Sequence, residues 1–168
     1  GIVEFIEAII YMKEDLQYEF TAWIAGIHLN KPSKRLKNAL EIASTKNYID
    51  IVGSIKGEEK WKKLLDTNFF ILPSYYKSEA LPLSLVEAMR SGCCCISSSV
   101  GEIKDLLANE RGVILKKVNT QNLVSAMDSC FKNIDKSKNI SNESYLFIKQ
   151  KFSHKNFQKK VMHVLNNT

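Results

Sequence analysis

Two glutamates with seven residues between them, Glu79 and Glu87, are the side chains of this sequence best placed to do chemistry. Glu79 is expected in a loop at the carboxyl end of a strand, and Glu87 lies early in the helix that is expected to follow. In open parallel sheets this edge is where ligands bind. Carboxylates accept hydrogen bonds from hydroxyl groups, so the spacing predicts a site for a polyhydroxylated ligand.

The start of that helix provides a complementary group for an anion. The backbone amides of Leu83, Ser84 and Leu85 are expected to have no partner within the helix, and such amides attract phosphate. Together with the two carboxylates they form a cradle for a diphosphate that joins two polyhydroxylated rings. A nucleotide-sugar would use every part of this cradle.

A strand, a loop, a helix and a second strand position these groups. Residues 69–72 are a continuous apolar run that ends at Pro73, which is typical of a strand buried on both faces of a parallel sheet. A helix over 83–91 follows, with Gly92 as the residue that ends it, and 93–96 is the next buried strand. The pattern predicts one βαβ unit whose connection carries both carboxylates.

The rest of the chain continues the alternation of strands and helices. Strands are expected at 18–24, 48–52 and 112–115, and helices at 2–9, 32–43, 58–65 and 119–130, followed by two helices that Ser141 and Ser153 would cap. In helix 58–65, Trp61, Leu64 and Leu65 are expected to face the core. We therefore predict an α/β fold, a Rossmann-like doubly wound parallel sheet with helices on both faces. A length of 168 residues fits a single domain over 1–168.

These motifs resemble those of a known family. The E-x7-E region of retaining glycosyltransferases of family 4 is similar to Glu79-Ala-Leu-Pro-Leu-Ser-Leu-Val-Glu87-Ala-Met, with Leu72-Pro-Ser-Tyr before it and Gly92 and Val100-Gly101 after it. That family has the two-domain GT-B fold, and the chain resembles its C-terminal, donor-binding domain over nearly the whole length. The chain departs from the family at Ala80 and Glu102, where Gly is common.

The resemblance implies a role for each site residue. Glu79 would be the catalytic residue that holds the transferred sugar, and Glu87 would accept hydrogen bonds from the ribose hydroxyls. The substrate-binding residues that it implies are Glu87, Ala80, Leu81, Leu83, Ser84, Gly53 and Ser54. Gly53 and Ser54 would face the base, although a tight turn is an equally good reason for Gly53. No metal and no cofactor are expected apart from the nucleotide-sugar, which is the substrate.

The resemblance also implies what the whole protein does. The enzyme would transfer a hexose to a glycan or lipid-linked acceptor with retention of configuration. This chain would lack the first strand of its domain, a basic motif that neutralises the diphosphate, and the N-terminal acceptor domain, so it is expected to be inactive alone. The expected location is the cytoplasm, with peripheral association of the full-length enzyme at the inner membrane face.

The charged residues of the sequence help to decide between a donor-binding domain and the alternative functions. The net charge of +6 comes almost wholly from Lys, with only Arg35, Arg90 and Arg111 as arginines, so a partner that is a nucleic acid is not expected. A solvated Lys-rich surface is favoured over a nucleic-acid or membrane-surface site. A non-enzymatic αβα interaction or regulatory domain is the main alternative, although the sequence shows neither the acidic cluster nor the flavin loop that it would need. No apolar run is long enough to span a membrane.

Four cysteines and one histidine are further candidates. Cys93, Cys94 and Cys95 are adjacent on an expected strand and point to alternate faces, so they cannot converge on one metal. With Cys130 they are expected to be free, buried thiols, and a reactive thiol is the alternative. His28 follows a strand at the ligand-binding edge, but an exposed loop histidine is the preferred interpretation.

Overall fold

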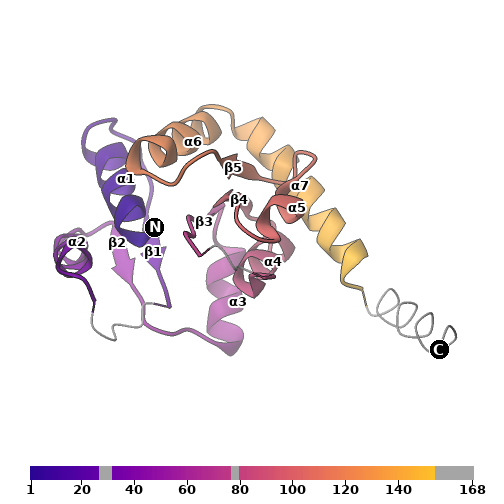
Figure 1. Cartoon of the computed structure of the whole chain (residues 1–168), viewed down its shortest axis with the longest axis horizontal. Coiled ribbons are helices and arrows are strands. Elements are labelled where there is room, and N and C mark those ends of the chain that lie inside the picture. The colour runs from indigo at the N-terminus through magenta and orange to yellow at the C-terminus, as the bar shows by residue number, and fades with distance from the viewer. Residues whose placement is uncertain (27–31, 77–79, 154–168) are drawn as a thin grey trace, which may run out of the picture.

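A computed structural model describes residues 1–26, 32–76 and 80–153 (Figure 1). The helices are α1 (Ile2–Glu14), α2 (Lys34–Ser44), α3 (Gly57–Leu65), α4 (Leu83–Arg90), α5 (Ile103–Leu107), α6 (Thr120–Lys132) and α7 (Ile134–Lys151). The strands are β1 (Ala22–Ile24), β2 (Ile49–Ile51), β3 (Phe69–Leu72), β4 (Cys94–Ser98) and β5 (Val113–Leu115). Helices and strands alternate through most of the chain, as the sequence predicts.

Every strand pairing is parallel, and helices cover both sides of the strands, which confirms the predicted fold class. The strands form two sheets, β1-β2 and β3-β4-β5, where one continuous sheet was expected. The two sheets are joined through side chains. Trp23 on β1 donates a hydrogen bond from Nε1 to Oγ1 of Thr67, just before β3, at 2.9 Å.

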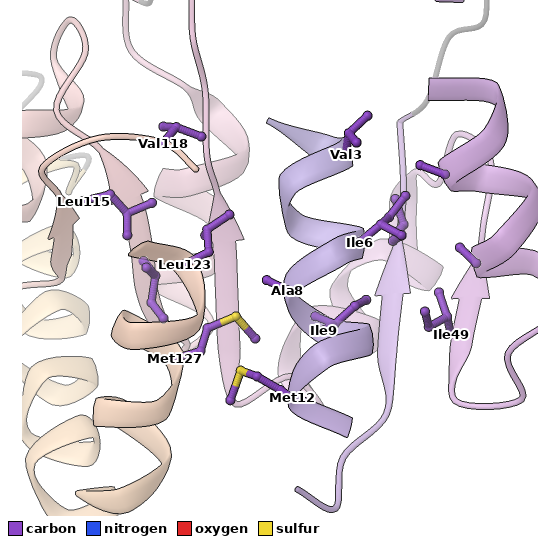
Figure 2. Close-up of a cluster of buried hydrophobic side chains, with 14 of the residues drawn as sticks. Val3, Ile6, Ala8, Ile9, Met12, Ile49, Leu115, Val118, Leu123 and Met127 are labelled. Carbon is purple, nitrogen blue, oxygen red and sulfur yellow. The ribbon is translucent and has the colours of Figure 1, made fainter. Parts of the chain in front are cut away.

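Helix α1 packs on both sheets and so holds them together. One core cluster contains Ile24 and Ile49 from the first sheet and Ile96 and Leu115 from the second, with Ile6 and Ile9 of α1 among them. In Figure 2 the α1 helix lies between strands of the two sheets, and Met12 and Met127 extend toward each other from α1 and α6. This shared apolar core joins the two sheets, which have no described strand pairing with each other.

A second core lies on the other side of β4. It joins Leu64 of α3, Leu85 and Met89 of α4, and side chains of α5 and α7. Successive residues of a strand point to opposite faces. Cys95 accordingly belongs to this second core, whereas its neighbour Ile96 belongs to the first.

Several sequence expectations need correction. The four residues of β3 are only half-buried, because β3 lies at an edge of its sheet and pairs with β4 alone among the described strands.

In α3, Leu64 is buried as expected, but Trp61 and Leu65 are exposed. Their spacing of three and four residues places the three side chains on one side of the helix, but only Leu64 belongs to a core cluster.

The expected strand at 18–24 forms only over Ala22–Ile24. The alternating aromatics that extended the prediction have a different role. The rings of Tyr18 and Phe20 both pack edge-on against Phe131 of α6, with centroids 5.4 and 5.8 Å away. Their spacing therefore reflects packing on one aromatic side chain and not pairing in a sheet.

The last described helix, α7, begins at Ile134, before the start that was expected at Ser141. Ser141 is not a cap but lies inside α7, and its hydroxyl donates to the carbonyl oxygen of Gly92. Buried residues Ile140, Ser144 and Ile148 at four-residue intervals keep one side of α7 against α4 and β4. The helix expected after Ser153 falls in 154–168, outside the described residues.

Candidate functional site

The site lies at the edge where the parallel strands end. Helix α3 begins after β2, and helix α4 begins after β3, so the N-termini of both helices face this edge. The backbone links the loops that follow β1 and β2. Val52 donates its amide to the carbonyl oxygen of Ile24 at 2.9 Å, and Gly26 donates to that of Gly53 at 3.1 Å.

Glu87 projects from the middle of α4 and forms an ion pair with Lys60 of α3. The distance from Lys60 Nζ to Glu87 Oε1 is 2.5 Å. The two side chains are 27% and 26% exposed, so the pair is shielded but still open to solvent. Lys60 also lies 5.2 Å from the ring centroid of Trp61, close enough for a cation–π contact.

The second carboxylate oxygen of Glu87 is free to bind a ligand. Oε2 has no hydrogen-bond partner among the residues that the structure describes. A carboxylate accepts hydrogen bonds on both oxygens. Glu87 can therefore accept a hydrogen bond from a hydroxyl group on Oε2 while Lys60 remains bound to Oε1.

The N-terminus of α4 is open. Pro82 precedes it and makes no side-chain cap, and within the described parts of the chain the amides of Leu83 and Ser84 have no partner. Leu83 is 69% exposed, so the first residue of the helix lies at the surface. The amide of Leu85, also predicted to be free, instead donates to the carbonyl oxygen of Pro82 at 3.0 Å. Two of the three predicted anion-binding amides are thus available.

The other predicted residues divide into exposed and undescribed ones. Gly53, Ser54, Ala80 and Leu81 are all exposed around this edge. A side chain at Gly53 would meet nothing within 4 Å, and the backbone φ there is not positive, so turn geometry does not require this glycine. Glu79 and His28 lie outside the described residues.

The start of α1 borders the same edge. A Cβ on Gly1 would come within 1.9 Å of the carbonyl oxygen of Pro73, so the helix begins in close contact with the loop after β3. The Arg35 guanidinium binds Glu4 and Glu7 of α1, each at 2.9 Å. Hydrogen bonds from Thr120 and then from Arg35 hold the pKa of Glu7 below its usual value. These contacts fix α1 relative to α2 and α6.

Sequence reasoning missed two polar residues here. Lys60 meets Glu87 across 27 positions, and no local pattern links them. Ser98 ends β4, and its buried hydroxyl has no partner within the described residues. Its position at the carboxyl end of an expected strand could have marked Ser98 as a candidate site residue, since ligands bind at these ends in parallel sheets.

The cysteines are free and buried, as predicted. Burial raises the pKa of the Cys93 thiol to about 12 and that of Cys95 well above its usual value. Because the thiolate is the reactive form, both are poor nucleophiles near neutral pH.

The described ranges contain neither a candidate metal cluster nor a candidate membrane span. Across residues 1–26, 32–76 and 80–153, no cluster of three or more His, Cys, Asp or Glu side chains could hold a metal ion. No helix in these ranges has both the length and the apolarity to cross a membrane.

The chain matches one protein family and several solved structures. The family model for glycosyl transferases group 1 matches residues 1–147. No curated protein matches the chain significantly. Anabaena HepE in complex with UDP is 17% identical with a TM-score of 0.82, and the match covers 100% of this chain and 45% of HepE. The chain thus spans less than half the length of that relative.

Two other structures give the same result. The C-terminal domain of a glycosyl transferase group 1 family protein, LpcC from Francisella tularensis, is 19% identical with a TM-score of 0.75, over 92% of this chain and 80% of that one. Sucrose-phosphate synthase from Thermosynechococcus elongatus is 17% identical with a TM-score of 0.78, over 99% of this chain and 43% of that one. The shared fold is that of the C-terminal domains of GT-B glycosyltransferases.

Proposed function

Because the chain belongs to the glycosyl transferases group 1 family, we propose that it binds the nucleotide-sugar donor of a retaining, family 4 hexosyltransferase. Glu87 accepts hydrogen bonds from the ribose hydroxyls. The amides of Leu83 and Ser84 bind the diphosphate, and Glu79 holds the sugar that is transferred. Gly53 and Ser54 face the base, and Ala80 and Leu81 line the sugar end of the site.

One observation carries this proposal. The carboxylate of Glu87, with one oxygen free, lies on the same short helix as the unpaired amides of Leu83 and Ser84. Hydroxyl acceptors beside phosphate-binding amides match a ribose linked to a diphosphate. HepE, which shares the fold, has been solved with UDP and with UDP-glucose, and this supports the same class of ligand here.

The rest of the enzyme is also part of the proposal. The acceptor, a glycan or lipid-linked sugar, binds an N-terminal domain, and the isolated chain has no transferase activity. Basic residues outside the chain neutralise the diphosphate, and no metal takes part. The enzyme works in the cytoplasm, with peripheral association at the inner membrane face.

The first strand that the family resemblance implies is also part of the proposal. We place it between β1 and β3, because each of these strands has one unpaired edge within the described structure and Trp23 and Thr67 already link them. A longer protein that includes this strand should show slower amide exchange in β1 and β3. Unchanged exchange there would argue against the placement.

A thermal-shift screen tests the central proposal. The chain is heated with UDP, GDP, ADP and their sugars, since a ligand at about a hundred times its Kd stabilises the native state by about 2.7 kcal/mol. We expect at least one nucleotide diphosphate to raise the melting temperature of the parent but not that of Glu87→Ala. No shift with any nucleotide would overturn the donor-site proposal.

A further inference from the structure

We infer that Lys60 is a positioning residue of the donor site, which fixes the Glu87 carboxylate with Oε2 free for the ribose hydroxyls. The inference rests on the proposed function of Glu87. It assigns a role to a side chain of α3, whereas every site residue predicted on a helix belongs to α4. Lys60 need not contact the ligand, because it acts through the orientation and charge of Glu87.

The geometry of the pair favours such a role. Lys60 Nζ lies 2.5 Å from Glu87 Oε1, and only about a quarter of each side chain is exposed. Partial burial strengthens the attraction between two charges, because less water screens them. The two helices are also fixed relative to each other, since Leu64 of α3 packs in one core cluster with Leu85 and Met89 of α4.

The ion pair prepares Glu87 for a diol. A free glutamate samples several rotamers, and a ligand that selects one of them must offset the lost entropy. Lys60 removes part of that cost before the ligand arrives, because it already holds Oε1. Oε2 keeps its full capacity to accept hydrogen bonds, so preorganisation does not occupy the binding atom.

The charge of Lys60 matters as well. Glu87 lies one helical turn from Ser84, whose amide is proposed to bind a diphosphate. A carboxylate so close to a bound anion would weaken binding by repulsion. The ammonium group of Lys60 balances the charge of Glu87, which leaves the helix N-terminus attractive to phosphate.

Lys63 provides a matched control on the same helix. It also forms an ion pair, with Asp50 of β2 at 3.3 Å, and it also lies over an indole ring, that of Trp23 at 5.7 Å. Its side chain is 30% exposed, close to the value for Lys60. Replacing either lysine therefore removes the same charge from α3, but only Lys60 contacts Glu87.

Calorimetric titration with the tightest binder among UDP, GDP and ADP tests the inference. Lys60→Met should weaken nucleotide binding about fivefold, because it removes a partly shielded ion pair with Glu87. Lys63→Met should weaken binding by less than about twofold, because the ion pair that it removes does not involve Glu87. Lys60→Arg should bind the nucleotide with an affinity within about twofold of the parent, because arginine keeps the positive charge. If Lys60→Met does not fold, Lys60→Gln takes its place.

A double-mutant cycle separates positioning from a structural role. In a Glu87→Gln background, Lys60→Met should change affinity by less than about twofold, since there is no carboxylate left to orient. The same loss in both backgrounds, or no loss in the first, would overturn the inference. Failure of the proposed function looks different, because Glu87→Ala would then bind the nucleotide as tightly as the parent.

Discussion

The two ends of α4 differ in how their backbone groups are satisfied. At the C-terminus, Ser91 donates to the carbonyl oxygens of Glu87 and Ala88 at 2.9 and 3.1 Å, and Cys93 donates to that of Ala88 at 3.0 Å. Ser141 of α7 then donates to the carbonyl oxygen of Gly92. At the N-terminus, no side chain caps the helix, and the amides of the exposed residues Leu83 and Ser84 have no described partner. The backbone groups at one end are satisfied, and the other end carries the amides that we propose to bind a diphosphate.

Two of the described helices, α2 and α6, have a side-chain cap at the N-terminus, whereas α1, α3, α5 and α7 lack one, as α4 does. Asn119 caps α6 by accepting a hydrogen bond from the amide of Asn122 at 2.7 Å. Ser33 caps α2 in the same way at 3.2 Å, with Leu36 as the donor. A cap contributes about 1 kcal/mol to stability. Helix α4 lacks this stabilisation at the edge where ligands are expected.

The largest predicted effect is on the buried side of α4. Leu85 is fully buried in the second core, so Leu85→Ala should lower the free energy of unfolding by about 2 to 5 kcal/mol. Urea denaturation measures the loss. The exposed neighbour Leu83→Ala is the control and should cost far less; equal losses would contradict the division between the two sides of the helix.

The second largest effect is expected at the N-terminus of α4, in the affinity for a nucleotide diphosphate and not in stability. Leu83 is the first residue of α4 and follows Pro82, whose backbone is extended, so Leu83→Pro fits the helix and removes one amide donor. Loss of a hydrogen bond to an anion costs about 1.5 to 3 kcal/mol, which predicts roughly tenfold weaker nucleotide diphosphate binding or more. Titration of Leu83→Pro against Leu83→Ala measures it. Equal affinity for these two variants would mean that this amide does not bind the diphosphate.

The smallest effect belongs to the closed end. Gly92 has a φ of +83°, and a side chain there would meet only Ser141 Oγ at 3.9 Å, so conformation and not space limits substitution. Gly92→Ala should cost about 1 kcal/mol of stability and leave nucleotide affinity unchanged. Thermal unfolding and titration of one sample give both values, and a change in affinity would show that the two ends are coupled.

Local signals explain what the sequence could predict. The run Phe69–Leu72 ended at Pro73 and matched β3 to the residue, and Gly92 and Asn119 marked helix ends as expected. Each of these signals lies within a few residues of the feature that it controls. The carboxylate of Glu87 and the open amides of α4 were predictable for the same reason.

Contacts between distant residues explain the errors. Tyr18 and Phe20 alternate because of Phe131, more than a hundred positions away, and Ser141 has its partner at Gly92. The ion pair between Lys60 and Glu87 likewise depends on how α3 and α4 pack. Periodicity assigns elements, but it does not show which side chains meet across them.

The most direct test of the whole account compares Glu87→Ala with Glu79→Ala. Glu87 should bind the ribose that a nucleotide diphosphate and its sugar share, so its loss should weaken both by roughly tenfold or more, the value of a charge-assisted hydrogen bond. Glu79 should contact only the sugar, so its loss should weaken the nucleotide-sugar and leave the diphosphate nearly unchanged. Calorimetric titration of both variants with both ligands measures the asymmetry. If Glu87→Ala binds the nucleotide diphosphate as tightly as the parent, this edge is not a donor site, and a non-enzymatic interaction domain becomes the better account.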